Sequence, residues 1–223
     1  MKISHKERYR KVLEWFQINM PVAESELKYK NPFQLAVSVI LSAQCTDKRV
    51  NLVTPALFER FPDPVAMSGA TAEEIFRYIS SVTYPNSKSK HLSQMAKVLV
   101  SEFNGVLPEE TKDLQRLPGV GRKSANVIAS VIYDSPVIAV DTHVFRISRR
   151  LGLSKGETPL AVEKELTENI PPEKRAIAHH WLILHGRYIC VARKPKCEVC
   201  GLALFCLYYH MSGRTDLHKS GTR

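Results

Sequence analysis

The sequence from residue 117 to residue 123 is Leu-Pro-Gly-Val-Gly-Arg-Lys. Its two glycines, Gly119 and Gly121, permit backbone angles that are closed to other residues and allow another molecule to approach the backbone closely. A short helix is predicted before the turn, over 111–116, and a helix with an apolar face is predicted after it, over 124–133. The stretch therefore predicts a helix–tight turn–helix unit, in which backbone N–H groups at a helix N-terminus offer a site for an anion. An ordinary corner between two helices would carry the same glycines.

The composition favours a globular protein with a polyanionic partner. The chain has 223 residues, of which 44% are hydrophobic, and its 32 Lys and Arg residues outnumber 22 Asp and Glu residues to give a formal net charge of +10. Nucleic acid is the commonest partner of such a basic chain, although charge alone does not establish one. No apolar run approaches the roughly 20 residues that a membrane-spanning helix needs, and the N-terminus lacks the apolar segment of a signal peptide. We therefore expect a monomer without a membrane partner, located inside the cell in the reducing cytoplasm or nucleoid.

Helix-start signals recur along the chain. At 31–43, an Asn-Pro pair precedes a run that is apolar on nearly every face, which predicts a central, buried helix. A capping box is predicted at 71–74, and a capped helix that a glycine ends is predicted at 141–152. Residues 136–140 are apolar enough for a strand, but they have no partner strand, so we expect a buried extended connector. The predicted fold class is all-α, with about ten helices and no sheet.

The predicted helices group into two helical lobes. Residues 26–134 are continuous and contain the central helix and the glycine turn, so we expect them to form one helical domain. The helix predicted over 9–19 carries large aromatic side chains on its apolar face, and these need a partner. We therefore expect residues 1–25 to pack with residues 135–223 in a second domain, and we expect a frayed tail after residue 207.

Four of the five cysteines lie close together near the C-terminus. They are Cys190, Cys197, Cys200 and Cys206. Four thiolates on one short segment bind Zn²⁺ or an iron–sulfur cluster, whereas a zinc ribbon usually has two Cys-x-x-Cys pairs and this segment has one. The spacing therefore favours a cubane wrapped by a single segment over structural zinc or four unliganded thiols. We interpret the fifth cysteine, Cys45, as a small buried hydrophobic residue.

A strongly basic loop lies between the first two of these cysteines. Residues 191–196 include Arg193, Lys194 and Lys196. A loop that a metal group holds in place, with three cations, is suited to contact the phosphate groups of a nucleic acid. A solvated run of surface charge is the simpler interpretation of the same residues.

Three motifs together resemble those of one enzyme family. The 117–123 turn, the sequence Val-Asp-Thr-His at 140–143 and the spacing of the four cysteines are similar to those of endonuclease III, a family of helix–hairpin–helix DNA glycosylases, and the similarity is collinear over about 5–206. The resemblance implies two helical lobes, with damaged duplex DNA bound across the cleft between them, and one [4Fe-4S] cluster on the four cysteines. It also implies a base excision repair enzyme that removes oxidised or saturated pyrimidines and then nicks the abasic strand.

The resemblance also implies roles for single residues. Lys123 corresponds to the catalytic nucleophile of the family, Asp141 to its catalytic acidic partner, and Gln44 to the residue that fills the gap left by an extruded base. Tyr84 stands at the wedge position, where the family usually has an aliphatic residue, so the preference for the opposing base stays open. The predicted DNA contacts are Gln44, Tyr84, Leu117, Gly119, Val120, Gly121, Arg122, His143, Arg193, Lys194 and Lys196.

The chemistry of the two catalytic residue types is consistent with the resemblance. A lysine in its neutral form is a nucleophile that forms a Schiff base with a sugar, and the Schiff base permits β-elimination of the phosphate. We expect Lys123 to be partly buried, because a free lysine, with a pKa of about 10.4, is almost fully protonated at neutral pH. Asp141 would stabilise the developing sugar cation and help to move protons. Taken singly, Lys123 is an ordinary surface lysine and Asp141 is a helix cap.

Two other functions compete with this one. An adenine-excising, monofunctional glycosylase of the same fold would lack the turn lysine and would carry an extra C-terminal domain, for which 223 residues leave no room. A non-enzymatic DNA-binding protein with structural zinc would share the basic charge and the cysteines. The identity of the bound metal and covalent trapping on abasic-site DNA distinguish these alternatives.

Overall fold

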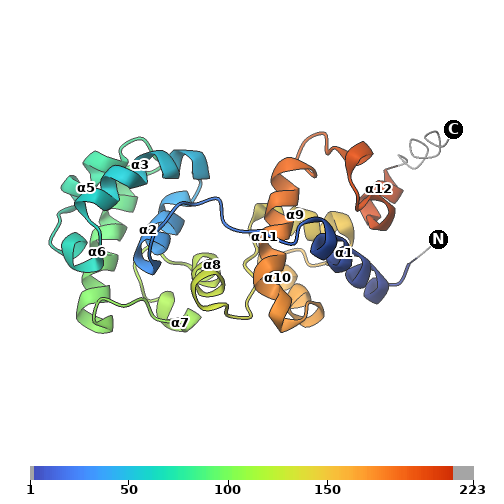
Figure 1. Ribbon diagram of the computed structural model, residues 1–223, viewed down its shortest axis with the longest axis horizontal. Coiled ribbons are helices and arrows are strands. Elements are labelled where there is room, and N and C mark those ends of the chain that lie inside the picture. The colour runs from blue at the N-terminus through green and yellow to red at the C-terminus, as the bar shows by residue number, and fades with distance from the viewer. Residues whose placement is uncertain (1–2, 213–223) are drawn as a thin grey trace. The chain divides into compact units, whose positions relative to one another are not determined.

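The structure of the chain, a computed structural model, describes residues 3–212. These residues contain twelve α-helices, α1 to α12, and two short 3₁₀-helices, η1 and η2, and they contain no β-strand (Figure 1). The predicted all-α fold class is therefore confirmed. The chain divides into two compact units, one formed by Ser25–Ser135 and the other by Met1–Glu24 together with Pro136–Arg223. Among the described helices, none is long and apolar enough to cross a membrane.

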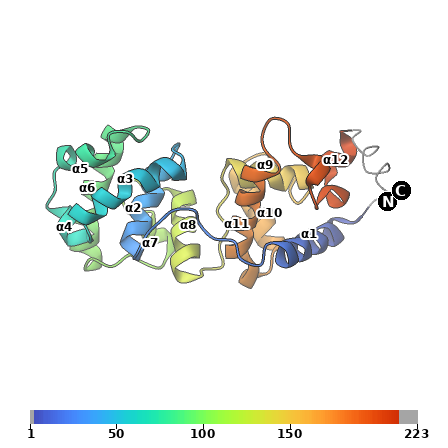
Figure 2. The same cartoon turned by 45° about the horizontal axis from the view of Figure 1, so that its top comes forward.

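The continuous unit, Ser25–Ser135, is built around one buried helix. Its helices are α2 (Pro32–Ser42), α3 (Asp47–Arg60), α4 (Pro64–Ser68), α5 (Ala72–Ile79), α6 (Pro85–Phe103), α7 (Thr111–Leu114) and α8 (Arg122–Tyr133). Every residue of α2 from 33 to 41 is buried, and the helix packs against α3, α6 and α8 (Figure 2). Asn31 caps this helix by accepting a hydrogen bond from the Gln34 N–H at 2.9 Å. The predicted central helix is therefore confirmed.

Side-chain caps fix most of the helix starts. Seven of the described helices begin after a residue whose side chain accepts a hydrogen bond from the first turn, and this bond satisfies an N–H that has no acceptor within the helix. These caps are Ser4, Asn31, Thr46, Asp63, Thr71, Asp141 and Thr158. The capping box at 71–74 is present as predicted. The sequence reasoning missed α4, although Asp63 followed by proline is a signal of the same kind.

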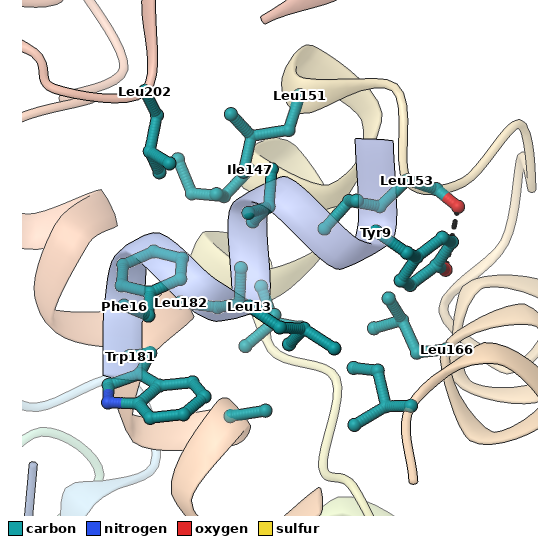
Figure 3. Close-up of a cluster of buried hydrophobic side chains, with 14 of the residues drawn as sticks. Tyr9, Leu13, Phe16, Ile147, Leu151, Leu153, Leu166, Trp181, Leu182 and Leu202 are labelled. Carbon is teal, nitrogen blue, oxygen red and sulfur yellow. Dashed lines mark hydrogen bonds between the residues drawn. The ribbon is translucent and has the colours of Figure 1, made fainter. Parts of the chain in front are cut away.

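The second unit joins the two ends of the chain in one core. Its helices are α1 (His5–Asn19), α9 (Thr142–Leu151), α10 (Pro159–Asn169), α11 (Pro172–Tyr188), η1 (Cys197–Val199), η2 (Ala203–Phe205) and α12 (Leu207–Met211). The Phe16 ring of α1 stacks on Trp181 of α11 with 5.6 Å between ring centroids (Figure 3). The Tyr9 hydroxyl donates to the Leu153 carbonyl oxygen at 2.7 Å. The apolar face of α1 is thus covered by residues from the last third of the chain.

Two segments of this unit test local predictions. Residues 136–140 form no strand, and the last three of them are buried, as expected for an extended connector. The frayed tail expected after residue 207 is wrong for 208–211, because α12 (Leu207–Met211) extends over these residues and its Tyr209 is buried in the core. The rest of that tail, residues 213–223, lies outside the described residues.

Candidate functional site

The glycine turn lies between α7 and α8 and is tight, as the sequence predicts. Gly119 has a φ of +85°, in the left-handed region, and the Val120 N–H donates to the Leu117 carbonyl oxygen at 3.0 Å. Gly121 has a φ of −87°, which any residue adopts, so the expectation of a special backbone angle is wrong for Gly121. The side chains of Leu117 and Val120 are buried, so they anchor the turn and leave only backbone atoms for a ligand.

The N-terminus of α8 is the place where this turn presents N–H groups. Gly121 is the N-cap of α8, and no side chain accepts a hydrogen bond there, in contrast to the seven helices with side-chain caps. The first N–H groups of a helix have no acceptor within the helix and carry partial positive charge, so this terminus is suited to an anion. Arg122 and Lys123 are both exposed in the first turn. The expected partial burial of Lys123 is therefore wrong.

A second feature of the same unit brings together two exposed residues with unusual backbones. Gln44, between α2 and α3, has a φ of 52°, and Tyr84, before α6, has a φ of 55°. The Tyr84 side chain is 60% exposed. The Thr83 hydroxyl donates to the Gln44 carbonyl oxygen at 2.9 Å, so the two turns lie side by side. Non-glycine residues in the left-handed region are uncommon and cluster at functional sites.

In each of these turns the structure differs from one prediction made from the local sequence. The sequence Tyr-Pro-Asn-Ser at 84–87 favours Asn86 or Ser87 as the helix cap, but α6 begins at Pro85, and Tyr84 caps it without a side-chain hydrogen bond. Cys45, beside Gln44, is half-buried rather than fully buried, so the interpretation as a core residue is wrong.

Asp141 begins α9 in the other unit. Its Oδ1 accepts a hydrogen bond from the Val144 N–H at 2.7 Å, which makes it the N-cap of the helix and fixes its carboxylate. Two residues later, His143 is half-buried, and its Nδ1 lies 3.3 Å from Arg146 Nη2. The Arg146 Nη2 also donates to the Gly186 carbonyl oxygen of α11 at 2.9 Å. Burial lowers the pKa of the Arg146 guanidinium, and the nearby Arg150 adds to this effect.

The four cysteines line one pocket in this unit. Cys190 follows α11, Cys197 begins η1, Cys200 follows η1 and Cys206 precedes α12. Apolar residues such as Leu151 complete the pocket wall, and burial raises the pKa of the Cys200 and Cys206 thiols to about 11. Within the described residues, no three His, Cys, Asp or Glu side chains are arranged to hold a single metal ion. The four cysteines therefore share one pocket.

The basic loop after Cys190 is held by an arginine that sequence reasoning missed. Arg150 of α9 donates from Nη1 to the Val191 carbonyl oxygen and from Nη2 to the Ala192 carbonyl oxygen, both at 2.8 Å. Its guanidinium also lies over the Tyr208 ring, 4.9 Å from the centroid. The loop cations Arg193, Lys194 and Lys196 are all exposed. No signal in the sequence separates Arg150 from the other arginines, because its acceptors are backbone atoms 41 and 42 residues away.

Comparison with known proteins defines the class first. The family model described as "HhH-GPD superfamily base excision DNA repair protein" matches residues 37–172, which is more than half of the chain. This match spans the glycine turn, Lys123 and Asp141. A thermostable thymine-DNA glycosylase of known structure, only 20% identical, has the same fold with a TM-score of 0.82 over 92% of this chain and 98% of that chain. The protein is therefore of the helix–hairpin–helix base excision repair class.

More similar relatives narrow the class to one family. Endonuclease III of Rickettsia conorii is 48% identical over 89% of this chain and 95% of its own length. Endonuclease III of Escherichia coli is 39% identical over 92% and 97% of the two chains. The solved structure of a trapped endonuclease III–DNA covalent intermediate is 40% identical, with a TM-score of 0.89 over 95% of this chain and 99% of that chain. The chain belongs to the endonuclease III family, whose members are DNA glycosylases and abasic-site lyases.

Proposed function

We propose that the protein removes oxidised or saturated pyrimidines from duplex DNA and cleaves the strand at the resulting abasic site by β-elimination. The observation that carries this proposal is an exposed amine, Lys123, in the first turn of the uncapped helix α8, directly after the glycine turn. A protein that only binds DNA needs no nucleophile at this point. The similar endonuclease III structure contains a covalent protein–DNA intermediate, which supports a covalent step.

The N-terminus of α8 would hold a phosphate of the damaged strand. Its first N–H groups lack a side-chain cap, and Arg122 adds positive charge beside them. Gly121 presents no side chain and is free of neighbouring atoms, so a phosphate can approach the turn there, and the left-handed backbone of Gly119 shapes the turn. Leu117 and Val120 contribute through their backbone atoms, because their side chains belong to the core.

Lys123 would be the nucleophile. The neutral amine attacks the sugar carbon that bears the damaged base, and the carbon–nitrogen bond to the base breaks, so the base leaves with a proton. The bond between the same sugar carbon and the ring oxygen then opens, so that the ring oxygen takes a proton and the lysine–sugar bond becomes a protonated Schiff base. This Schiff base acidifies the neighbouring sugar carbon, whose proton is lost as the bond to the 3′ phosphate breaks. Lys123 is exposed, so its amine can reach the sugar of a bound nucleotide.

Asp141 would be the acidic partner in this reaction. Its bond to the Val144 N–H holds the carboxylate in one orientation at the start of α9. A carboxylate fixed in this way stabilises the positive charge that develops on the sugar without having to reorganise first. His143, two residues further along, would contact DNA beside it.

Gln44 and Tyr84 would enter the duplex where the nucleotide leaves. Both side chains are exposed on turns that hydrogen bond to each other. A stacked base is out of reach of an enzyme, so the nucleotide must be extruded at a cost of a few kcal/mol. A tyrosine ring stacks on any base and offsets part of this cost.

The cysteine pocket fits one [4Fe-4S] cluster better than a single zinc ion. All four cysteines line the same pocket and include a single Cys-x-x-Cys pair, whereas a zinc ribbon usually has two such pairs, and a cubane takes one cysteine for each of its four irons. Cys190, Cys197, Cys200 and Cys206 would be the ligands. When bound, the cluster would supply cross-links that fix the loop of Arg193, Lys194 and Lys196, and these cations would contact backbone phosphates.

These assignments give the two domains different roles. We propose a helical domain, 26–134, that holds the hairpin, and an iron–sulfur domain, 1–25 with 135–223, that supplies the acid and the basic loop. None of the five cysteines forms a disulfide, which is consistent with the reducing interior of a cell, and we place a monomeric enzyme there with its DNA.

Covalent trapping tests the proposed function. Borohydride should trap the native protein on abasic-site DNA, because it reduces a Schiff base to a stable amine. Lys123→Gln should give no adduct while it still binds the same DNA, because the glycine turn is unchanged. Arg122→Gln is the matched control, since it removes the neighbouring charge and keeps the amine. An adduct that persists in Lys123→Gln would place the nucleophile elsewhere, and no trapping or nicking by the native protein would refute the lyase.

A further inference from the structure

Lys88 is a lysine with a buried side chain. It lies in the first turn of α6, and the residue is only 5% exposed. Its Nζ donates to the Leu41 carbonyl oxygen at 2.8 Å and to the Ala43 carbonyl oxygen at 2.7 Å. Burial of an amine costs free energy unless its protons have hydrogen-bond acceptors. The role of Lys88 therefore depends on its two hydrogen bonds.

These two bonds complete the C-terminus of α2. The last carbonyl groups of a helix have no partner within it. The Ser42 hydroxyl donates to the Val39 carbonyl oxygen, and the Ala43 N–H donates to the Ile40 carbonyl oxygen. The last turn of α2 has no basic residue of its own, so Lys88 of another helix supplies the positive charge that a helix C-terminus favours.

The same lysine is tied to both of the turns that carry the exposed residues Gln44 and Tyr84. Its backbone N–H donates to the Tyr84 carbonyl oxygen at 3.1 Å, four residues earlier. Its Nζ holds the Ala43 carbonyl oxygen, immediately before Gln44. The bond from Thr83 to Gln44 is a second connection between the turns, but it is exposed, whereas the Lys88 bond to Leu41 is buried and its bond to Ala43 is partly buried.

We propose that Lys88 is a positioning residue that fixes the spacing of Gln44 and Tyr84, so that both side chains enter the duplex together when a nucleotide is extruded. This inference rests on the proposed function. Lys88 acts through the two turns and does not touch DNA, since its amine is used by two carbonyl groups in the interior.

Burial lowers the pKa of the Lys88 ammonium from its ordinary value, while Cys45 nearby acts in the opposite direction. Both the charged and the neutral amine have enough protons for two carbonyl acceptors, so the bonds survive either state. The positioning role therefore depends on the amine itself, and a methionine, of similar length and without donors, removes it while keeping the side chain apolar and flexible.

The test measures base unstacking directly. A duplex that carries a stable abasic-site analogue, with 2-aminopurine as the neighbouring base, brightens when that base is unstacked by the bound protein. Lys88→Met should lose most of the brightening at saturating protein, and should bind this duplex at least about tenfold more weakly, because turns that are no longer held in place have to be ordered when DNA binds. Lys97→Met is the matched control, since it removes an exposed charge from the same helix, and it should behave as the native protein does.

A second pair of variants keeps the test valid if Lys88→Met fails to fold. Thr83→Val removes the exposed connection, and Thr83→Ser retains its hydroxyl, so only the first should reduce the brightening, and by less than Lys88→Met. Equal brightening by native protein and folded Lys88→Met would overturn the proposal, as would native protein that does not brighten the duplex. If Lys88→Met does not fold, equal brightening by Thr83→Val and Thr83→Ser would overturn it as well. The analogue undergoes no chemistry, so the brightening test does not depend on the lyase reaction. If the native protein brightens this duplex but borohydride traps no adduct on abasic-site DNA, the proposed lyase is refuted and the role of Lys88 is not.

Discussion

Gly119 lies directly against the imidazole of His91. A Cβ built on Gly119 would be 3.0 Å from His91 Cβ and 3.2 Å from its Cγ, and the glycine φ is +85°. At Gly121 a Cβ would meet no atom within 4 Å, and its φ of −87° suits any residue. The two glycines of the hairpin therefore have different reasons to be glycine. Gly119 is required by the fold, and Gly121 is free for a ligand.

Alanine should affect protein stability at Gly119 and DNA binding at Gly121. Gly119→Ala should lower the free energy of unfolding by about 1–2 kcal/mol, from the left-handed backbone alone, and more from the contact with His91. Gly121→Ala should leave stability nearly unchanged and weaken DNA binding, because its methyl group stands where a phosphate would approach α8. Thermal unfolding and fluorescence anisotropy with a labelled duplex measure the two effects.

A double variant separates the two costs at Gly119. His91→Ala with Gly119→Ala should recover the steric part of the loss and leave the backbone part. Lys112→Met, which removes one exposed lysine, is the reference for the DNA affinity of Gly121→Ala. If Gly121→Ala binds DNA as tightly as the native protein while Lys112→Met binds clearly more weakly, the turn is only a corner between helices.

Asp141 should be separable into a structural and a chemical role. Asn is as good a helix cap as Asp, so Asp141→Asn should keep the bond to the Val144 N–H and the stability of α9. It should strongly slow base excision, because the charge opposite the sugar cation is gone. Asp141→Ala should also lose about 0.5–2 kcal/mol of stability. Single-turnover excision and thermal unfolding distinguish the two variants, and an active Asp141→Asn would leave this residue as a cap only.

The sequence predicts the features of the site whose causes are local. The glycine turn, the cap at Asp141 and the cysteine spacing each depend on residues within a few positions of one another, so their patterns predict them. The burial of α2 also follows from its own apolar residues. The resemblance to the family depends only on such local features: the 117–123 turn, the sequence at 140–143 and the spacing of the four cysteines.

The parts that the sequence did not predict depend on distant contacts. Lys88 resembles any helix lysine until its acceptors, 45 and 47 residues earlier, are known. Arg150 likewise binds carbonyl groups of a distant loop. The helix α12 is five residues long and has no side-chain cap, and it is held because Tyr209 is buried. Lys123 is exposed, which differs from the expectation, because the burial of a side chain depends on the elements around it and not on its own chemistry.

The identity of the metal group is a separate prediction. Protein isolated without air oxidation should be yellow-brown and contain iron rather than zinc, because four cysteines with a single Cys-x-x-Cys pair line one pocket. Cys200→Ala should lose the colour and weaken DNA binding as the 191–196 loop loses its anchor. Cys45→Ala is the matched control and should keep the iron, since Cys45 lies in the other compact unit. Zinc without iron in the native protein would contradict the assignment.

The stacked pair Phe16 and Trp181 should dominate the stability of the unit that contains the cysteines. Phe16 is 1% exposed and Trp181 is 2% exposed, and their rings are nearly parallel, with an angle of 6° between them. Phe16→Ala should cost about 3–5 kcal/mol, because it leaves a cavity in a close-packed core. Ile18→Ala, an exposed position on the same helix, should cost little. Denaturant unfolding followed by tryptophan fluorescence measures both, and equal midpoints would show that α1 is not part of the core.

Tyr84 should show stability and function changing in opposite directions. Its backbone is in the left-handed region, where a non-glycine residue costs about 1–2 kcal/mol and glycine costs little. Its ring is 60% exposed, so little packing is lost when it is removed.

Tyr84→Gly should therefore keep or raise the unfolding temperature while it slows excision of a paired lesion, because no ring remains to stack in the gap. Tyr84→Phe keeps the ring and should excise at close to the native rate. The loss in Tyr84→Gly should shrink for a lesion placed in a mismatch, where extrusion costs less. Native excision of paired lesions by Tyr84→Gly would remove Tyr84 from the wedge position.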